Sequence, residues 1–375
     1  HKNIEVMLNA TCNAWFTDNY LPIIQAKRLY KVRAKECIVA SGAFEQHVVF
    51  RNNDLPGIVM SSAAERLLKL YAIKPGQRAV IVTVNDMGYM TALDLAEQGV
   101  DVAAVVDMRS TTCGQWAEAM MAKGITVKLG YTVYQAHANK AKLHLNAVEV
   151  RKITGRGCVD RYTDTIECDL LCMSAGDMPA YQLLCQAGGK LSYDDDSASF
   201  KLSDLPANLH IAGSVNGKHS LAAVQADGER AAEQALVNLG LLDAVTTTSE
   251  CDVQVNYDWP IFPHPQGKDF VDFDEDLQTQ DIVNTTHLGY RDVQLVKRFS
   301  TVGMGPSQGR HSALPTARLV ADATQRTVAK TGVTTARPPF GVEKLAHMAG
   351  RRFDPIRRTA MHQRHLQLGA TMMPA

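Results

Sequence analysis

The first forty residues alternate between apolar and polar positions, which is the pattern of strands that are buried on one face. Two such stretches flank a turn at Asp18–Asn19, and the second stretch ends in the small residues Ser41 and Gly42. Small residues at the end of a buried strand let the backbone approach a ligand closely. A helix is predicted next, over residues 61–71.

Residues 78–150 show the clearest regular pattern. Apolar runs of strand length alternate there with amphipathic helical stretches. The predicted strands cover residues 78–83, 100–106 and 126–129, and the predicted helices cover residues 89–98 and 115–123. The order β-α-β-α-β is typical of a doubly wound parallel sheet.

More strands and one long helix follow this unit. The predicted elements are a hairpin over residues 141–168 with its turn at 154–157, strands over 169–174 and 209–212, and a helix over 221–239. Small residues thus close two strands, one near Ser41 and one near Ser214. Doubly wound sheets bind dinucleotides at such strand ends.

Charge is balanced overall but unevenly distributed. The 375 residues include 39 Lys and Arg and 39 Asp and Glu, and a net charge of zero argues against nucleic-acid binding. Residues 251–282 are acidic and residues 291–365 are rich in Arg and His. These parts either pair with each other, dock on a partner, or form two solvated faces. No apolar run reaches the length of a membrane span.

The eight cysteines form no C-x-x-C pair, which predicts free thiols in a reducing, cytoplasmic compartment. Cys168 and Cys172 are expected on one face of a strand, where they favour packing over a zinc site. The histidines near the end of the chain lack neighbouring carboxylates, so no metal site is predicted there.

The loop over residues 83–88 follows a buried strand, where a dinucleotide fingerprint would lie. Only Gly88 of that fingerprint is present, and Asp86 would repel a phosphate. Asp107, at the end of the next strand, has a side chain suited to a ribose hydroxyl. A structural relic and a working dinucleotide site are both compatible with this pattern.

Three segments carry a resemblance to a known family. Residues 34–57 resemble the ATG-type segment of flavoprotein reductases with two dinucleotide-binding domains. Within residues 269–341, the motifs GMGPSQGRHS and TTARPP resemble the alpha subunit of heterotetrameric sarcosine oxidase and the large subunit of N-methylglutamate dehydrogenase. The resemblance covers essentially the whole chain, and both ends look cut, as in an internal fragment.

The resemblance implies an α/β fold: a flavoprotein-reductase-like pair of dinucleotide-binding domains, then a small helical module that has lost its iron–sulfur ligands. The implied segments are residues 1–72 and 176–245 (first dinucleotide-binding domain), 73–175 (an inserted second Rossmann-like domain), 246–350 (the helical module) and 351–375 (the start of an aminomethyltransferase-like, folate-binding domain).

The resemblance also implies NAD, or FAD, in the first dinucleotide-binding domain. The residues that match its contacts are Thr11, Cys12, Ser41, Gly42, Gly213, Ser214 and His219. For His219 the alternative is a polar residue that merely begins a helix.

Relatives with an iron–sulfur cluster hold it by four cysteines, and the equivalent positions here are Asp272, Asp274, Ser307 and Ser312. A cluster needs thiolates, so no iron–sulfur cluster is predicted.

The resemblance implies instead an FMN shared with a beta subunit. A loop with exposed N–H groups and a fixed Arg charge suits an anion. The candidate residues are Thr301, Gly303, Met304, Gly305, Ser307, Gln308, Gly309, Arg310, Thr334, Thr335 and Arg337, with Lys297 and His311 as lesser ones. The alternative is a loop that only connects helices.

The implied function is oxidative demethylation of a secondary amine such as sarcosine, an oxidation at a CH–NH group that gives formaldehyde or one-carbon tetrahydrofolate. The substrate would bind to a partner chain, within a heterotetramer of alpha, beta, gamma and delta subunits, and this chain would supply no catalytic residue. Two alternatives stay open: a cofactor-free scaffold subunit, and an NADH-linked disulfide-type reductase.

Overall fold

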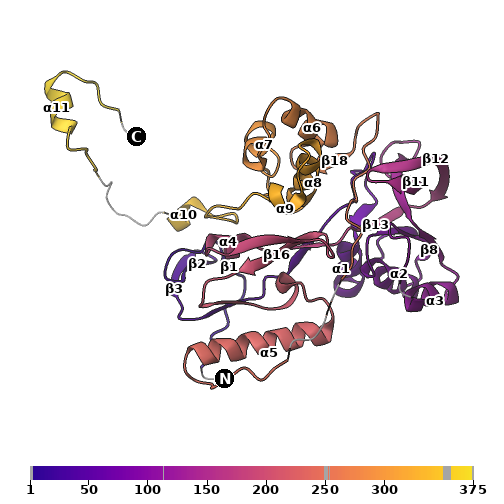
Figure 1. Cartoon of the computed structure of the whole chain (residues 1–375), viewed down its shortest axis with the longest axis horizontal. Helices are drawn as coiled ribbons and strands as arrows, with labels where there is room; N and C mark the ends of the chain where they lie inside the picture. Colours follow the sequence, from indigo (N-terminus) through magenta and orange to yellow (C-terminus); the bar gives the residue numbers. More distant parts are fainter. Residues whose placement is uncertain (1–2, 113, 249–251, 253, 349–355, 374–375) are drawn as a thin grey trace.

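The computed structural model describes residues 3–112, 114–248, 252, 254–348 and 356–373. These residues form a first unit that ends in the long helix α5, a second unit with α1, α2 and α3, and a helical module with α6, α7, α8 and α9 (Figure 1). A C-terminal arm with α10 and α11 leads away from all three (Figure 1).

The first unit consists of small sheets rather than one large sheet. An antiparallel sheet has the order β1-β2-β3, β4 and β17 pair in parallel, and β5–β14 and β15–β16 are antiparallel pairs. The bounds are β1 Ala10–Cys12, β2 Tyr20–Gln25, β3 Arg28–Arg33, β4 Cys37–Val39, β5 Ala43–Glu45, β14 Asp177–Pro179, α4 Gln182–Gln186, β15 Lys190–Asp194, β16 Ser199–Asp204, β17 Leu209–Ile211, the 3-10 turn Gly213–Asn216 and α5 Leu221–Asn238.

The second unit has a five-stranded parallel sheet of order β6-β13-β7-β8-β9, which confirms the predicted doubly wound pattern. Alternation along β7 sends Val80 and Val82 to the core on one face and Ala79 and Ile81 to the core on the other. The bounds are β6 Ile58–Met60, α1 Ser61–Tyr71, β7 Arg78–Thr83, α2 Met87–Glu97, β8 Asp101–Asp107, α3 Gly114–Ala122, β9 Thr126–Leu129 and β13 Leu170–Ser174.

A three-stranded antiparallel sheet, β10-β11-β12, completes the second unit. Its bounds are β10 Tyr131–Ala138, β11 Leu145–Gly155 and β12 Cys158–Glu167. The turn between β11 and β12 lies where the sequence predicts a hairpin turn. The five-stranded sheet corrects one predicted boundary, because β6 pairs with β13 and places residues 58–71 in the second unit. The first unit therefore ends before residue 58 and not at residue 72.

The helical module follows a short hairpin, and its core also includes Trp259 and Val49 from outside the module. The bounds are β18 Phe270–Asp272, β19 Leu277–Gln278, α6 Thr279–His287, α7 Val293–Ser300, α8 Ala313–Ala323 and α9 Val328–Thr331. Asp292 caps α7 by accepting a hydrogen bond from the N–H of Gln294.

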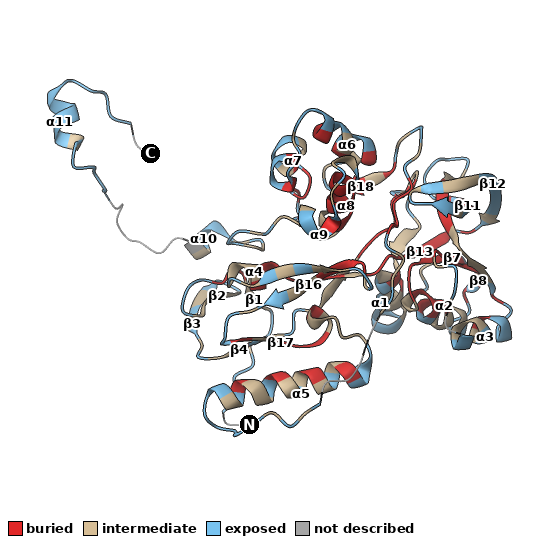
Figure 2. Cartoon of the chain, viewed as in Figure 1, coloured by how far each residue is buried: buried red, intermediate tan, exposed pale blue. Residues whose placement is uncertain are grey.

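The arm contains α10 Leu345–Met348 and α11 His362–Gln367. Its described residues from 356 onward are almost all exposed (Figure 2). Part of the expected folate-binding segment, residues 351–355, lies outside the described residues. In the portion of the chain that the structure covers, no helix combines the length and apolarity of a membrane-crossing segment.

Two local predictions are wrong. The extended stretch after Asp18–Asn19 is not one strand, because a turn at Ala26, which has φ +53°, divides it into β2 and β3. Cys168 and Cys172 do not share a face: β13 begins only at Leu170, so Cys168 packs in the cluster on one side of the sheet and Cys172 in the cluster on the other.

Candidate functional site: a cationic cavity between the helical module and the first unit

A cavity of about 380 Å³ lies where α7, the loop after α7, residues 334–339 and the start of α4 meet. We call it the cationic cavity. Its lining residues are Tyr181, Gln182, Gln294, Lys297, Arg298, Met304, Gln308, Thr334, Thr335, Ala336, Arg337, Pro338 and Pro339. The structure therefore brings together Met304, Gln308 and Lys297 with Thr334, Thr335 and Arg337, although about thirty residues separate the two groups in the sequence.

The cavity has an unbalanced positive charge. Lys297, Arg298 and Arg337 line it, and none of its described lining residues is acidic. Burial lowers the pKa of Lys297, and the nearby Arg337 charge lowers it further. A negatively charged ligand would relieve both effects, because it would offset the lost hydration and separate the like charges.

Residues 334–343 form a strap that holds one wall of the cavity against the first unit. The Tyr181 hydroxyl donates to the carbonyl oxygen of Thr334 at 3.1 Å. Further along, the buried Asn13 side chain donates from Nδ2 to the Gly341 carbonyl oxygen at 3.1 Å and to Glu343 Oε1 at 2.7 Å. The position of Arg337 thus depends on contacts with a distant part of the sequence.

In the loop between α7 and α8, two of the N–H groups expected to face an anion donate instead to carboxylates of the chain itself. The N–H of Gly303 donates to Asp272 Oδ2 at 2.7 Å, and the N–H of Ser307 donates to Asp274 Oδ2 at 2.8 Å. Gly305 lies against Asp274, and a Cβ added there would be 2.3 Å from that residue's Cβ. Asp272 and Asp274 thus accept hydrogen bonds from N–H groups that the sequence predicted to face an anion.

Other residues of this loop have structural contacts. Gly303 and Gly309 cross so closely that a Cβ on Gly303 would lie 3.2 Å from the Gly309 Cα. The Thr301 hydroxyl is 2.9 Å from Glu275 Oε2. The Arg310 guanidinium lies over the Phe340 and Phe44 rings, 4.5 and 5.3 Å from their centroids. Arg310 therefore joins the module to the first unit and is outside the lining of the cationic cavity.

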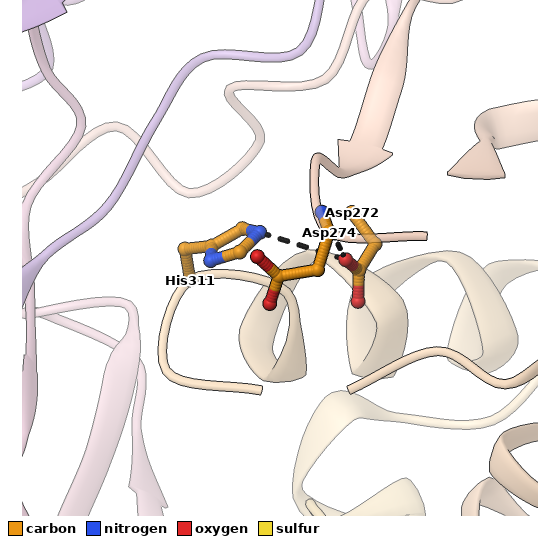
Figure 3. A group of neighbouring side chains, drawn as sticks. All are labelled: Asp272, Asp274 and His311. Atoms are coloured by element: carbon orange, nitrogen blue, oxygen red, sulfur yellow. Dashed lines mark hydrogen bonds and ion pairs between the residues drawn. The ribbon is translucent and has the colours of Figure 1, made fainter. Parts of the chain in front are cut away.

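Asp272, Asp274 and His311 lie together beside this loop (Figure 3). One ligand atom from each lies within 4.8 Å of the others, but these atoms are already engaged. The N–H of Phe273 donates to His311 Nε2 at 3.2 Å, and Asp272 Oδ1 accepts the N–H of Asp274 at 2.9 Å. Burial lowers the pKa of His311. These contacts suit a hydrogen-bonded network better than a metal site.

The turn after β17 is closed by carboxylates as well. The N–H of Gly213 donates to Asp227 Oδ2 at 3.0 Å, and the N–H groups of His219 and Ser220 donate to Asp252 Oδ2 at 2.6 and 2.8 Å. The cavity beside Ser214 and His219 has a volume of only about 30 Å³. As described, the turn with Gly213, Ser214 and His219 has neither the volume nor the free N–H groups to hold a dinucleotide phosphate.

Asp177 adds to the negative character of this turn, because it also lines the small cavity, with Oδ2 3.6 Å from His219 Nδ1. Burial raises the pKa of Asp177. A phosphate placed here would face two carboxylates besides Asp227.

Four other predicted residues lie apart from that turn or on its edge. Ser41 and Gly42 follow β4, where the Ser41 hydroxyl donates to the Ala180 carbonyl oxygen at 3.2 Å. Thr11 and Cys12 belong to the separate sheet β1-β2-β3, in which they pair with strand β2. Burial raises the pKa of Cys37 at the start of β4, at the end opposite Ser41, and a negative charge on Cys12 would raise that pKa further.

The loop after β7 is also closed. Arg109 clamps both Asp107 and Asp86, with Nη2 2.8 Å from Asp107 Oδ2 and 2.7 Å from Asp86 Oδ1. Tyr89 donates its hydroxyl to Asp107, which is fully buried. Gly88 packs on Thr83, where an added Cβ would lie 2.5 Å from the Thr83 Cβ. The carboxylate of Asp107 is thus committed to protein partners, which favours the relic over the working site.

Several residues that line these sites were not predicted from the sequence. Gln294 and Arg298 lie one helical turn apart on α7, so the helical spacing around Lys297 was the signal for them. Tyr181, Gln182 and Asp252 gave no such signal, because only the tertiary fold brings them to their sites.

Comparison with known proteins gives two closely related results. The sarcosine oxidase A3 domain family matches residues 266–351. A sarcosine oxidase subunit alpha from Rhizobium meliloti (strain 1021) is 30% identical over 394 residues, which cover 99% of this chain and 38% of that protein. One from Corynebacterium sp. (strain P-1) is 30% identical over 361 residues, which cover 92% of this chain and 37% of that protein.

Among solved structures, the crystal structure of L-proline dehydrogenase from P. horikoshii superimposes with a TM-score of 0.65 at 17% identity. It covers 91% of this chain and 64% of that chain, and it supports the dinucleotide-binding oxidoreductase fold alone. The chain spans little more than a third of the length of the curated relatives. It is similar over nearly its whole length to sarcosine oxidase alpha subunits, and its residues 266–351 match the sarcosine oxidase A3 domain family.

Proposed function

We propose that this chain is part of the alpha subunit of a multi-subunit flavoenzyme that oxidatively demethylates a secondary amine. Homology to sarcosine oxidase alpha subunits supports an oxidoreductase of this class. The cationic cavity is the observation that carries the proposal, because three cations without a facing carboxylate suit the phosphate and dipolar ring of a flavin.

The cationic cavity fits FMN chemically. Lys297, Arg298 and Arg337 would hold its phosphate or a reduced ring, while Gln308, Thr334 and Thr335 offer amide and hydroxyl groups for neutral hydrogen bonds. The flavin that accepts the hydride from the N-methyl group would sit in a beta-type subunit, and FMN, when bound in the cationic cavity, would supply a second flavin centre. The chain's own part is to position that group and to offset negative charge, with no residue acting as a general base.

The partners, products and location follow from the same homology. The substrate would bind on a beta-type subunit, which would close the cationic cavity, and gamma and delta-type subunits would complete the assembly. The product would be formaldehyde or one-carbon tetrahydrofolate, formed with a folate domain after residue 351, in the cytoplasm. Asp272, Asp274, Ser307 and Ser312 hold no thiolate, which supports a module without an iron–sulfur cluster.

The NAD or FAD predicted for the first unit would bind at the turn after β17, apart from the cationic cavity. The N–H groups of Gly213 and His219 already donate to the carboxylates of Asp227 and Asp252, so the described residues of this turn do not fit a pyrophosphate. This closure favours a second candidate function, that of a scaffold subunit without its own cofactor.

The two functions differ in cofactor content. We expect acid extraction of the purified intact complex to release FMN in proportion to this chain. Because charge-assisted hydrogen bonds contribute about 1.5–3 kcal/mol each, Lys297→Gln and Arg337→Gln should each weaken FMN binding about tenfold or more. The control is Arg66→Gln, which changes an exposed Arg on α1. A wild-type complex without flavin or nucleotide would establish the scaffold, and variants that keep wild-type FMN affinity would place the flavin elsewhere.

A further inference from the structure

A second cavity, which we call the junction cavity, lies where all three parts of the molecule meet. Its volume is about 490 Å³, within the size range of small-molecule sites. Its lining residues are Arg156 from the β11–β12 turn, Tyr193 and Asp195 from the first unit, Asp258, Arg326 and Thr327 from the link between α8 and α9, and Val328 and Ala329 from α9. It shares no lining residue with the cationic cavity.

Neutral partners hold both cations of the junction cavity in place. The Arg156 guanidinium lies 3.8 Å from the centroid of the Trp259 ring, and Trp259 is buried. Arg326 donates from Nε to Thr324 Oγ1 at 2.9 Å and from Nη2 to the carbonyl oxygen of Arg291. These contacts fix the two guanidinium groups but leave their charges unneutralised.

The two carboxylates are not neutralised either. Asp195 and Asp258 both line the cavity, and within the described chain neither makes an ion pair shorter than 4.0 Å. The cavity therefore presents two cations and two anions that do not compensate one another by direct contact.

Arg318 adds a buried positive charge behind the Tyr193 wall. Its side chain is 3% exposed, it donates from Nη2 to the Ala198 carbonyl oxygen at 2.7 Å, and its Nε has no partner among the described atoms. Burial lowers the pKa of Arg318, whereas the Tyr193 hydroxyl and Asp258 raise it. A buried guanidinium without a carboxylate contact is costly, and an anion bound nearby would reduce that cost.

We propose that the junction cavity binds a free α-amino acid in its zwitterionic form, with the carboxylate toward Arg156 and Arg326 and the ammonium toward Asp195 and Asp258. With Arg318 included, the surrounding charge is one unit positive, which favours the carboxylate. The two Asp side chains disfavour a dianion and provide the acceptors that an ammonium needs. This site is independent of the proposed cofactor in the cationic cavity.

The test is saturation-transfer NMR on the intact protein, with each of the twenty standard α-amino acids at a concentration of several millimolar. At least one should bind saturably, with a Kd on the order of 1 mM. Acetate and methylammonium, each of which carries only one of the two charges, should bind at least about tenfold more weakly than that amino acid.

Arg156→Gln and Asp258→Asn should each weaken amino-acid binding about tenfold. Arg161→Gln, which changes an exposed Arg on β12 of the same hairpin, should leave it unchanged. Three results would overturn the proposal: no saturable binding by any of the twenty, binding of acetate as tight as that of the amino acid, or unchanged binding in the Arg156 and Asp258 variants.

Discussion

Asp272 accepts hydrogen bonds from three backbone N–H groups, those of Gly303, Asp274 and Glu275, although it is fully buried. Asp274 accepts a further N–H from Ser307. At the scale of single residues, hydrogen bonds from surrounding N–H groups offset the free-energy cost of removing a carboxylate from water. The glycines of the loop are then needed for the close approach of this network rather than for a ligand.

Gly305 gives a direct test of this packing. Gly305→Ala would place a Cβ 2.3 Å from the Asp274 Cβ, and overpacking of this kind costs about 1–3 kcal/mol. We expect a lower free energy of unfolding by urea denaturation, with a lower Tm. Gly228→Ala is the control, because an added Cβ in the middle of α5 meets no atom within 4 Å and should stabilise the helix by about 0.5–1 kcal/mol. Equal effects of the two changes would contradict the packing described for the loop.

Individual residues were predictable where they belong to a recognisable motif. The proximity of Thr334, Thr335 and Arg337 to Met304 and Gln308 was expected from the two motifs. The contact of the Asp252 carboxylate with His219 was not expected, because it joins residues 33 positions apart on either side of α5. Spacing in the sequence indicates that an N–H group lies in a turn. It does not indicate which distant side chain accepts a hydrogen bond from that group.

At the scale of elements, β5 and α1 are joined by one carboxylate. Glu45, in β5, accepts the N–H of Ser62 in the first turn of α1 through Oε2 at 2.9 Å. Burial, with a contribution from the neighbouring Asp177 charge, raises the pKa of Glu45 to about 7, against the lowering effect of Ser62. The start of α1 is therefore sensitive to pH near neutrality.

The sign of this sensitivity follows from the raised pKa. The folded protein holds the Glu45 proton more tightly than the unfolded chain, so this group stabilises the fold below pH about 4.5 and loses that contribution as pH rises through about 7. We expect the free energy of unfolding of Glu45→Gln, relative to wild type, to increase between pH 5 and pH 8. Glu118→Gln changes an exposed glutamate in α3 and should give a constant difference. A constant difference for Glu45→Gln as well would mean that its carboxyl group has an ordinary pKa.

Most elements were predictable because their patterns are local. The helix over residues 61–71 begins and ends as predicted, α2 and α3 differ from prediction by one or two residues at each end, and α5 begins as predicted and ends one residue earlier. The β2–β3 turn was missed because Ala26 and Lys27 are not turn-forming residues, and its geometry depends on the paired strands. The placement of β6 in the second unit was not predicted for a similar reason, because the strand with which β6 pairs, β13, lies more than a hundred residues away in the sequence.

At the scale of the whole molecule, the strap joins the helical module to the first unit. Asn13 is its main anchor: besides the two side-chain hydrogen bonds given above, its carbonyl oxygen accepts the N–H of Phe340 at 2.8 Å. Arg310, between Phe44 and Phe340, adds a second contact near the same place. Such contacts between distant segments are not encoded by periodicity, so the sequence predicted the parts of the molecule better than their arrangement.

Removal of the anchor should loosen the strap without unfolding the units. In Asn13→Ala, amide hydrogen exchange measured by mass spectrometry should become faster in peptides that cover residues 334–343, because buried hydrogen bonds are lost there. Exchange in β7 and β8 should stay slow. The control Asn146→Ala changes an exposed residue near the start of β11, and it should leave amide exchange unchanged in both the strap and the β7–β8 strands. Unchanged exchange over the strap in Asn13→Ala would show that other contacts hold it.

The cationic cavity has walls from three separate regions, and one wall is fixed only while the strap stays docked. By thermodynamic reciprocity, any molecule that fills the cavity must tighten the docking of the module by the same factor by which docking improves that molecule's affinity. Docking of the helical module on the first unit and ligand binding in the cationic cavity are therefore thermodynamically coupled. A partner protein that binds the outer surface of the helical module and stabilises its docked position would then raise ligand affinity without contacting the ligand.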